Sequence, residues 1–153
     1  MKRRAVAIGL ALLVQVALLA AVAAPRLSPR LNGDEYRLAV VPVDPIDPFR
    51  GAYVDLRLRG VPTFTQREGT VYVQLVPMRG GIHRGSRTTQ FKPSAPPFLR
   101  CNADGEVRCG IESFFASQSD AKRLERELGR RGAIARVKID GAGRAALVDL
   151  EPR

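Results

Sequence analysis

Twenty consecutive uncharged residues, Ala5 to Ala24, constrain this chain more than any other feature. Ten of them are Leu, Val or Ile, and only Gln15 is strongly polar. With a rise of about 1.5 Å per residue, such a helix matches the hydrocarbon core of a bilayer, roughly 30 Å thick. We therefore expect a membrane segment at 1–25, a linker at 26–35 and a single domain at 36–153.

The charges around this segment predict its orientation. Lys2, Arg3 and Arg4 precede it, and basic residues at the start of a span favour the cytoplasmic side. Arg26 and Arg30 follow it and weaken the asymmetry without reversing it. We expect a single-pass protein of the cytoplasmic membrane, with its N-terminus in the cytoplasm and its domain on the extracytoplasmic (periplasmic) side.

A cleaved signal peptide is the alternative to an anchor. Ala21-Val22-Ala23 fits the small-residue cleavage pattern, so cleavage before Ala24 remains open. The apolar stretch is longer than the usual signal core of about 7–15 residues. We therefore expect the segment to stay attached, and either outcome places the domain outside the cytoplasm.

Net charge is +10, and arginine supplies most of the positive charge. Such a composition can reflect genome composition alone, or it can attract anionic lipid headgroups. The basic residues are spread along the chain rather than clustered among aromatics. Together with the expected compartment, this spread argues against nucleic-acid binding.

Hydrophobic patterns predict an α+β fold: an N-terminal transmembrane helix followed by a mainly antiparallel β-sheet domain with one covering helix. The covering helix is expected from a Ser cap near 117 to Arg131, before Gly132. The segment Arg79–Lys92 has the composition of a solvated loop, with a short strand near Thr88–Phe91 left open. The expected strands are Tyr36–Val41, Tyr53–Leu58, Thr70–Val76, Leu99–Cys101, Val107–Phe114, Ile134–Ile139 and Arg144–Leu150. The last two should close the chain as a hairpin across the turn Asp140-Gly141-Ala142-Gly143.

Prolines mark two expected breaks. Pro25 and Pro29 should end the helix, because proline removes a backbone donor and clashes with the preceding turn. Pro42, Pro45 and Pro48 exclude both a helix and a central strand, so we expect an extended, turning loop there.

Cys101 and Cys109 flank Asn102-Ala103-Asp104-Gly105, which is a hairpin signal. Outside the cytoplasm, two close cysteines are more often bonded than free. We expect a structural disulfide, with a redox-active pair and free thiols as the alternatives.

Metal, cofactor and nucleophile signals are weak. His83 is the one histidine, which leaves little room for a Ser-His pairing. Asp44 and Asp47 offer oxygen ligands, but a hard cation needs more of them. We expect no metal and no cofactor.

The densest constellation runs from Asp44 to Leu56, and a second distinctive stretch is Gly110–Phe115. Both stretches resemble the GDYXXLXY family of bacterial envelope proteins. Ala52 and Leu58 stand where the motif has Asp and Tyr. The resemblance implies membrane-anchored proteins without an assigned activity, often encoded beside multi-pass membrane proteins. The motif falls on Gly51, Ala52, Tyr53, Leu56 and Leu58.

Three functional hypotheses follow. The first is a non-enzymatic binding or accessory module for an integral membrane partner, and the second is an envelope hydrolase with Asp47 and Glu112 as an acid–base pair. The third is a lipid-surface binder that uses its arginines. A purely structural role of the same residues competes with all three. The expected partner-binding residues are Asp44, Asp47, Phe49, Arg50, Gly51, Tyr53 and Glu112.

Overall fold

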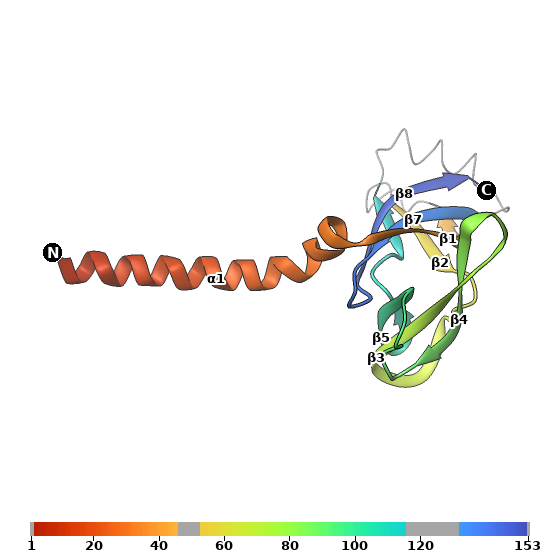
Figure 1. Cartoon of the computed structure of the whole chain (residues 1–153), viewed down its shortest axis with the longest axis horizontal. Coiled ribbons are helices and arrows are strands. Elements are labelled where there is room, and N and C mark those ends of the chain that lie inside the picture. Colours follow the sequence, from red (N-terminus) through yellow and green to blue (C-terminus); the bar gives the residue numbers. More distant parts are fainter. Residues whose placement is uncertain (1, 46–52, 116–131, 153) are drawn as a thin grey trace.

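The computed structural model describes residues 2–45, 53–115 and 132–152. In these residues one long helix precedes a single curled sheet (Figure 1), which confirms the predicted α+β class. The covering helix predicted at 117–131 lies outside the described residues. The elements are α1 (Lys2–Asn32), β1 (Asp34–Pro45), β2 (Tyr53–Leu58), β3 (Phe64–Pro77), the short 3-10 helix η1 (Arg79–Gly81), β4 (Ile82–Thr89), β5 (Phe98–Arg108), β6 (Ser113–Phe115), β7 (Ala133–Ile139) and β8 (Ala145–Pro152).

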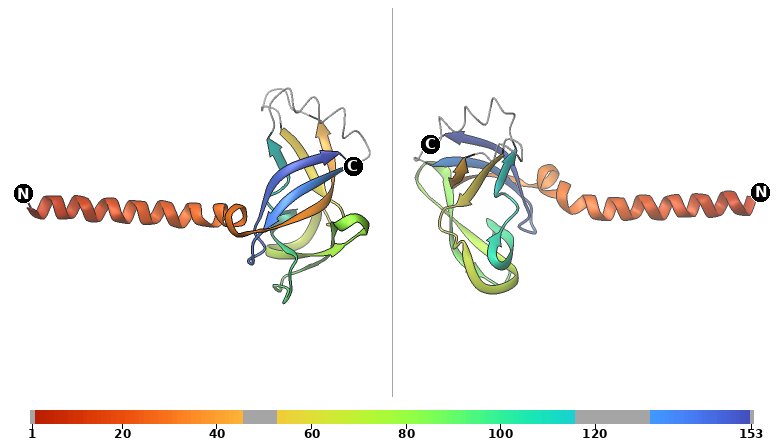
Figure 2. Two further views of the ribbon diagram at one scale, coloured as in Figure 1. Left: turned by 45° about the horizontal axis from the view of Figure 1, so that its top comes forward. Right: turned by 180° about the vertical axis from the view of Figure 1, so that it is seen from behind.

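Helix α1 is long and apolar enough to cross a membrane, and its side chains from Ile8 to Leu27 are exposed. It suggests a membrane anchor. The prediction that proline ends the helix near residue 25 is wrong, because α1 runs through Pro25 and Pro29 to Asn32. Figures 1 and 2 show the helix bending shortly before the sheet, as proline-containing helices do. Contacts with the domain keep this last part helical, since Pro29 is buried.

Strand β1 organises the sheet. It pairs antiparallel with β2 and β7 and parallel with β4. Along the main path of the sheet the strand order is β5-β3-β4-β1-β2-β6. β7 also pairs with β8, so the closing hairpin lies beside β1. The second view in Figure 2 shows the sheet curling around its own core. Every other described pairing is antiparallel, as expected.

The proline-rich continuation of β1 was expected to be a loop, but it is strand as far as Pro45. Beyond Val40, its pairing within the described residues is with β2 alone. Proline cannot donate to a ladder, so one-sided pairing accommodates Pro42 and Pro45. The register shifts between Pro42 and Asp44, where the proline pattern predicted irregular geometry.

Two further predictions are wrong. The expected loop Arg79–Lys92 contains β4, which pairs with both β3 and β1. The expected two strands around Gly105 are one strand, β5, followed by the short β6. β5 nevertheless folds back on itself, because Cys101 and Cys109 end only 4.0 Å apart at Cα. Gly105 has a φ of 70°, which eases this reversal.

The core lies inside the curl and draws on nearly every strand. Alternate residues of the strands supply it, as period-2 burial requires. The predicted closing hairpin is confirmed, with Ala135 opposite Leu150. The fully buried large side chains in the sheet are Leu38, Val40, Val71, Val73, Leu75, Leu99 and Val137.

Candidate functional site

The two distinctive sequence stretches are neighbours in the sheet. β2 pairs antiparallel with β6, which places Tyr53 opposite Phe115 and Asp55 opposite Ser113. The ladder ends where the Leu56 amide donates to the Glu112 carbonyl, at 2.7 Å. Residues more than fifty positions apart thus build one continuous surface.

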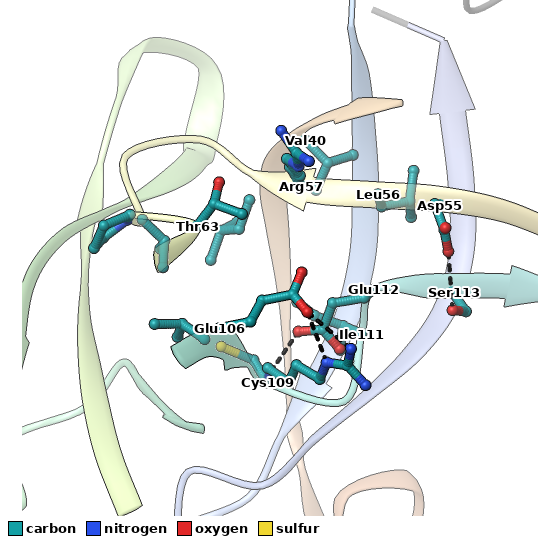
Figure 3. A pocket seen from close by; sticks show the side chains of 15 residues that line it. Val40, Asp55, Leu56, Arg57, Thr63, Glu106, Cys109, Ile111, Glu112 and Ser113 are labelled. Atoms are coloured by element: carbon teal, nitrogen blue, oxygen red, sulfur yellow. Dashed lines mark hydrogen bonds and ion pairs between the residues drawn. The ribbon is translucent and has the colours of Figure 1, made fainter. Parts of the chain in front are cut away.

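An open cleft of about 610 Å³ begins where this ladder ends. One wall is β2, and the other is formed by the end of β5 and the residues leading to β6, as Figure 3 shows. Its volume falls within the range of small-ligand and peptide-side-chain sites. The apolar lining comes from Val40, Leu56, Leu58, Val61, Pro62, Val107 and Ile111, and the polar lining from Asp55, Arg57, Thr63, Glu106, Arg108, Glu112 and Ser113.

Glu112 holds the turn at the base of this cleft. Its carboxylate accepts a hydrogen bond of 2.8 Å from the Gly110 amide and another from the Cys109 amide. Gly110 has a φ of 82°, which glycine adopts freely. A carboxylate that accepts two backbone hydrogen bonds is held as a structural group, and this geometry favours the scaffold role of Glu112.

The disulfide between Cys101 and Cys109 is formed, which confirms the predicted pairing. Both cysteines are buried, and Cys109 also lines the cleft. The bond therefore fixes the end of β5 directly beneath the turn that Glu112 closes. A disulfide is compatible with an extracytoplasmic domain.

Several polar side chains at the rim of the cleft form hydrogen bonds or ion pairs with one another. Ser113 donates to Asp55 at 3.3 Å across the β2–β6 ladder (Figure 3). Arg108 makes a two-nitrogen contact with Glu106, at 2.8 Å and 3.0 Å. Arg57 has no ion pair among the described residues, and its side chain is exposed. It is the rim group most available to a ligand.

The structure brings some of the predicted partner-binding residues together. Asp44 lies opposite Asp55 in the β1–β2 ladder, and Tyr53 begins the strand that forms one cleft wall. Glu112 lies at the cleft base. The remaining four, Asp47, Phe49, Arg50 and Gly51, lie outside the described residues. The distance between the carboxyl groups of Asp47 and Glu112, on which the hydrolase hypothesis depends, is therefore not described either.

A second polar cluster surrounds Asp140, which sequence reasoning treated as a turn residue. Asp140 is the buried charged residue of the described chain, at 7% exposure. One carboxylate oxygen accepts 3.0 Å bonds from the Ala142 and Arg144 amides, and the other accepts a 2.8 Å bond from the Arg144 guanidinium and a 2.7 Å bond from the Ser28 hydroxyl. Burial raises the pKa of Asp140, but the hydrogen bonds from Ser28, Arg144 and Ala142 outweigh it and hold the pKa below its ordinary value.

Potential metal ligands do not gather in the part of the chain that the structure describes. Within residues 2–45, 53–115 and 132–152, no three His, Cys, Asp or Glu side chains lie close enough to hold an ion. His83 instead packs edge-on against the Tyr36 ring, with ring centres 5.4 Å apart.

These features define a class of protein: a single apolar N-terminal helix carrying a small curled-sheet domain with a disulfide-braced cleft. A family model described as "GDYXXLXY protein" matches residues 15–150, so the chain belongs to the GDYXXLXY family. Searches of curated proteins and of solved structures found no match. The matched residues include the second half of α1 and nearly all of the domain, and the cleft lies between the two distinctive stretches.

Proposed function

We propose that this protein is a membrane-anchored accessory module that binds an integral membrane partner through the cleft between β2 and residues 106–113. The observation that carries the proposal is the pairing of β2 with β6, which places both distinctive stretches at one open, braced surface. Engaged polar groups and an apolar lining suit binding better than catalysis. A partner in the same membrane suits a domain held on a single span.

The domain is proposed to lie outside the cytoplasm. The basic residues Lys2, Arg3 and Arg4 before the span support this orientation, and the disulfide is compatible with it. Trypsin added to intact spheroplasts should digest the domain, whereas a cytoplasmic marker protein should survive. Digestion that requires membrane rupture would contradict the orientation.

The cleft is tested by charge reversal of Arg57, which has no ion pair among the described residues. Arg57→Glu should reduce recovery of the membrane partner at least tenfold when the intact protein is purified from detergent-extracted membranes. Arg87→Glu on β4 is the matched control, because Arg87 is exposed and lies outside the cleft. A thermal melt within a few degrees of the parent would show that both variants are folded.

Unchanged partner recovery with folded Arg57→Glu would reject the cleft as the binding surface. The loop from Asp44 to Tyr53 was expected to face the partner, and the strands β1 and β2 that run into this stretch contribute Val40 and Leu56 to the cleft lining. Arg50→Ala, which tests that loop, should leave the melt unchanged and reduce recovery. A variant that keeps both its stability and its partner would remove the loop from the proposal.

A further inference from the structure

Ser28, near the end of α1, hydrogen-bonds to both members of the direct ion pair between Asp140 and Arg144. Its hydroxyl donates to Asp140 at 2.7 Å and accepts from the Arg144 guanidinium at 3.2 Å. Ser28 and Asp140 are separated by 112 positions in sequence. The contact therefore joins the anchor helix directly to the β7–β8 turn.

The backbones at this junction also approach closely. Pro29 is almost fully buried, and the Gly33 amide donates to the Pro29 carbonyl at 3.0 Å. A Cβ at Gly33 would lie 2.3 Å from that carbonyl oxygen and 3.0 Å from the backbone of Ile139. Lys138 adds a 3.2 Å bond to the Arg30 carbonyl. Only glycine at position 33 permits this packing.

The same turn is tied to the other end of the sheet. The Arg100 amide of β5 donates to the Gly143 carbonyl at 2.6 Å, and a Cβ on Gly143 would lie 2.6 Å from the Phe98 ring. The turn thus contacts α1 on one side and β5 on the other. The turn therefore links the helix end to β5 as well as to its own hairpin.

We propose that Ser28, Asp140 and Arg144 form an anchor lock, a set of positioning residues that holds the domain in one orientation on its membrane helix. The chain between anchor and domain is then a rigid joint and not a flexible tether. Resting on the proposed function, the lock presents the cleft at a fixed height and direction, which suits a partner in the same membrane. A site already oriented loses less entropy on binding.

The test is a distance distribution measured by pulsed EPR on the full chain in lipid nanodiscs. Spin labels are placed on Leu19→Cys in α1 and Val148→Cys in β8, both exposed in the parent. The cysteines of the described chain are bonded, so the introduced thiols are labelled selectively. The parent should give one narrow distribution.

Two variants should open the joint. Gly33→Ala should broaden the distribution at least twofold through its clash with Pro29, and Ser28→Ala should broaden it to a smaller extent. Ser86→Ala is the matched control, because Ser86 hydrogen-bonds the Gln74 carbonyl on β3 away from the junction. Its distribution should equal that of the parent.

A second label pair, Phe91→Cys with Val148→Cys, lies wholly within the domain and reports whether the variants remain folded. This pair should stay narrow in Ser28→Ala, which changes only the helix side of the lock. A broad distribution in the parent, or an unchanged one in Ser28→Ala, would overturn the lock. The measurement needs no partner, so its failure and that of the proposed function are distinguishable.

Discussion

Asp140→Asn isolates the charge of the anchor lock while keeping its size. The amide oxygen can still accept from the Ala142 and Arg144 amides, which close the turn at 3.0 Å. The amide nitrogen then faces the Arg144 guanidinium, where the parent has a 2.8 Å ion pair. Two donors then meet, and the Nε–H of Arg144 loses its acceptor.

The expected cost follows from burial. Removing one partner of a buried ion pair costs about 3–5 kcal/mol, and leaving a buried donor unpaired costs about 1–3 kcal/mol. The Asp140 side chain is 5% exposed, but that of Arg144 is 34% exposed, so water can rehydrate the guanidinium. We therefore expect the free energy of unfolding to fall by about 2–4 kcal/mol.

Asp149→Asn is the matched control on the same hairpin. Asp149 lies 3.6 Å from Arg136 and its side chain is 48% exposed, so its ion pair should contribute less than about 1 kcal/mol. Urea unfolding of the full chain in detergent, followed by the far-ultraviolet circular dichroism of the sheet, gives both values. Equal losses in the two variants would refute the argument that burial at Asp140 carries the energy.

Three further outcomes are expected. Reducing the disulfide, whose cysteines are separated by 8 positions, should lower the free energy of unfolding by about 2.6 kcal/mol, and an unchanged urea midpoint would contradict this. Because the pKa of Asp140 is depressed, its contribution is complete above the ordinary value of 3.8 and is lost as pH falls through the folded-state pKa. The stability difference between parent and Asp140→Asn should thus persist near neutral pH and shrink in acid, and a constant difference would argue against it. Gly143→Ala should destabilise more than Gly69→Ala in the same urea assay, since both have φ near 80° but only Gly143 faces the Phe98 ring; equal losses would leave backbone strain as the whole effect.

Local patterns predicted the strands that obey them. Tyr53–Leu58 alternates clearly and has the predicted bounds, and the closing hairpin follows a turn rich in glycine. Strand β4 was missed because Ile82–Thr89 lacks apolar alternation. It is held by pairing with β3 and by a close approach in which a Cβ on Gly85 would lie 2.4 Å from Val61. Such contacts leave no periodic signal.

The site was predictable only in part. Family resemblance identified both stretches that border the cleft, and cysteine spacing identified its disulfide. The anchor lock could not be predicted from the sequence, because Asp140 lies in a turn, where an aspartate usually hydrogen-bonds to the nearby backbone. Its partner Ser28 lies in a segment that two prolines marked as a helix end. Only the fold brings them to 2.7 Å.

The pairing of β1 with β7 has a consequence for the order in which the chain is made. β1 leaves the ribosome directly after the anchor, whereas β7 and the turn that receives Ser28 come near the end. The lock partners are 112 positions apart, which at about 5–20 residues per second is a delay of roughly 6–22 s. During this interval the β7-facing edge of β1 has no native partner. Nascent domains of this kind are thus exposed to wrong pairing while they are being made, and a chaperone that covers extended strands would act at this stage.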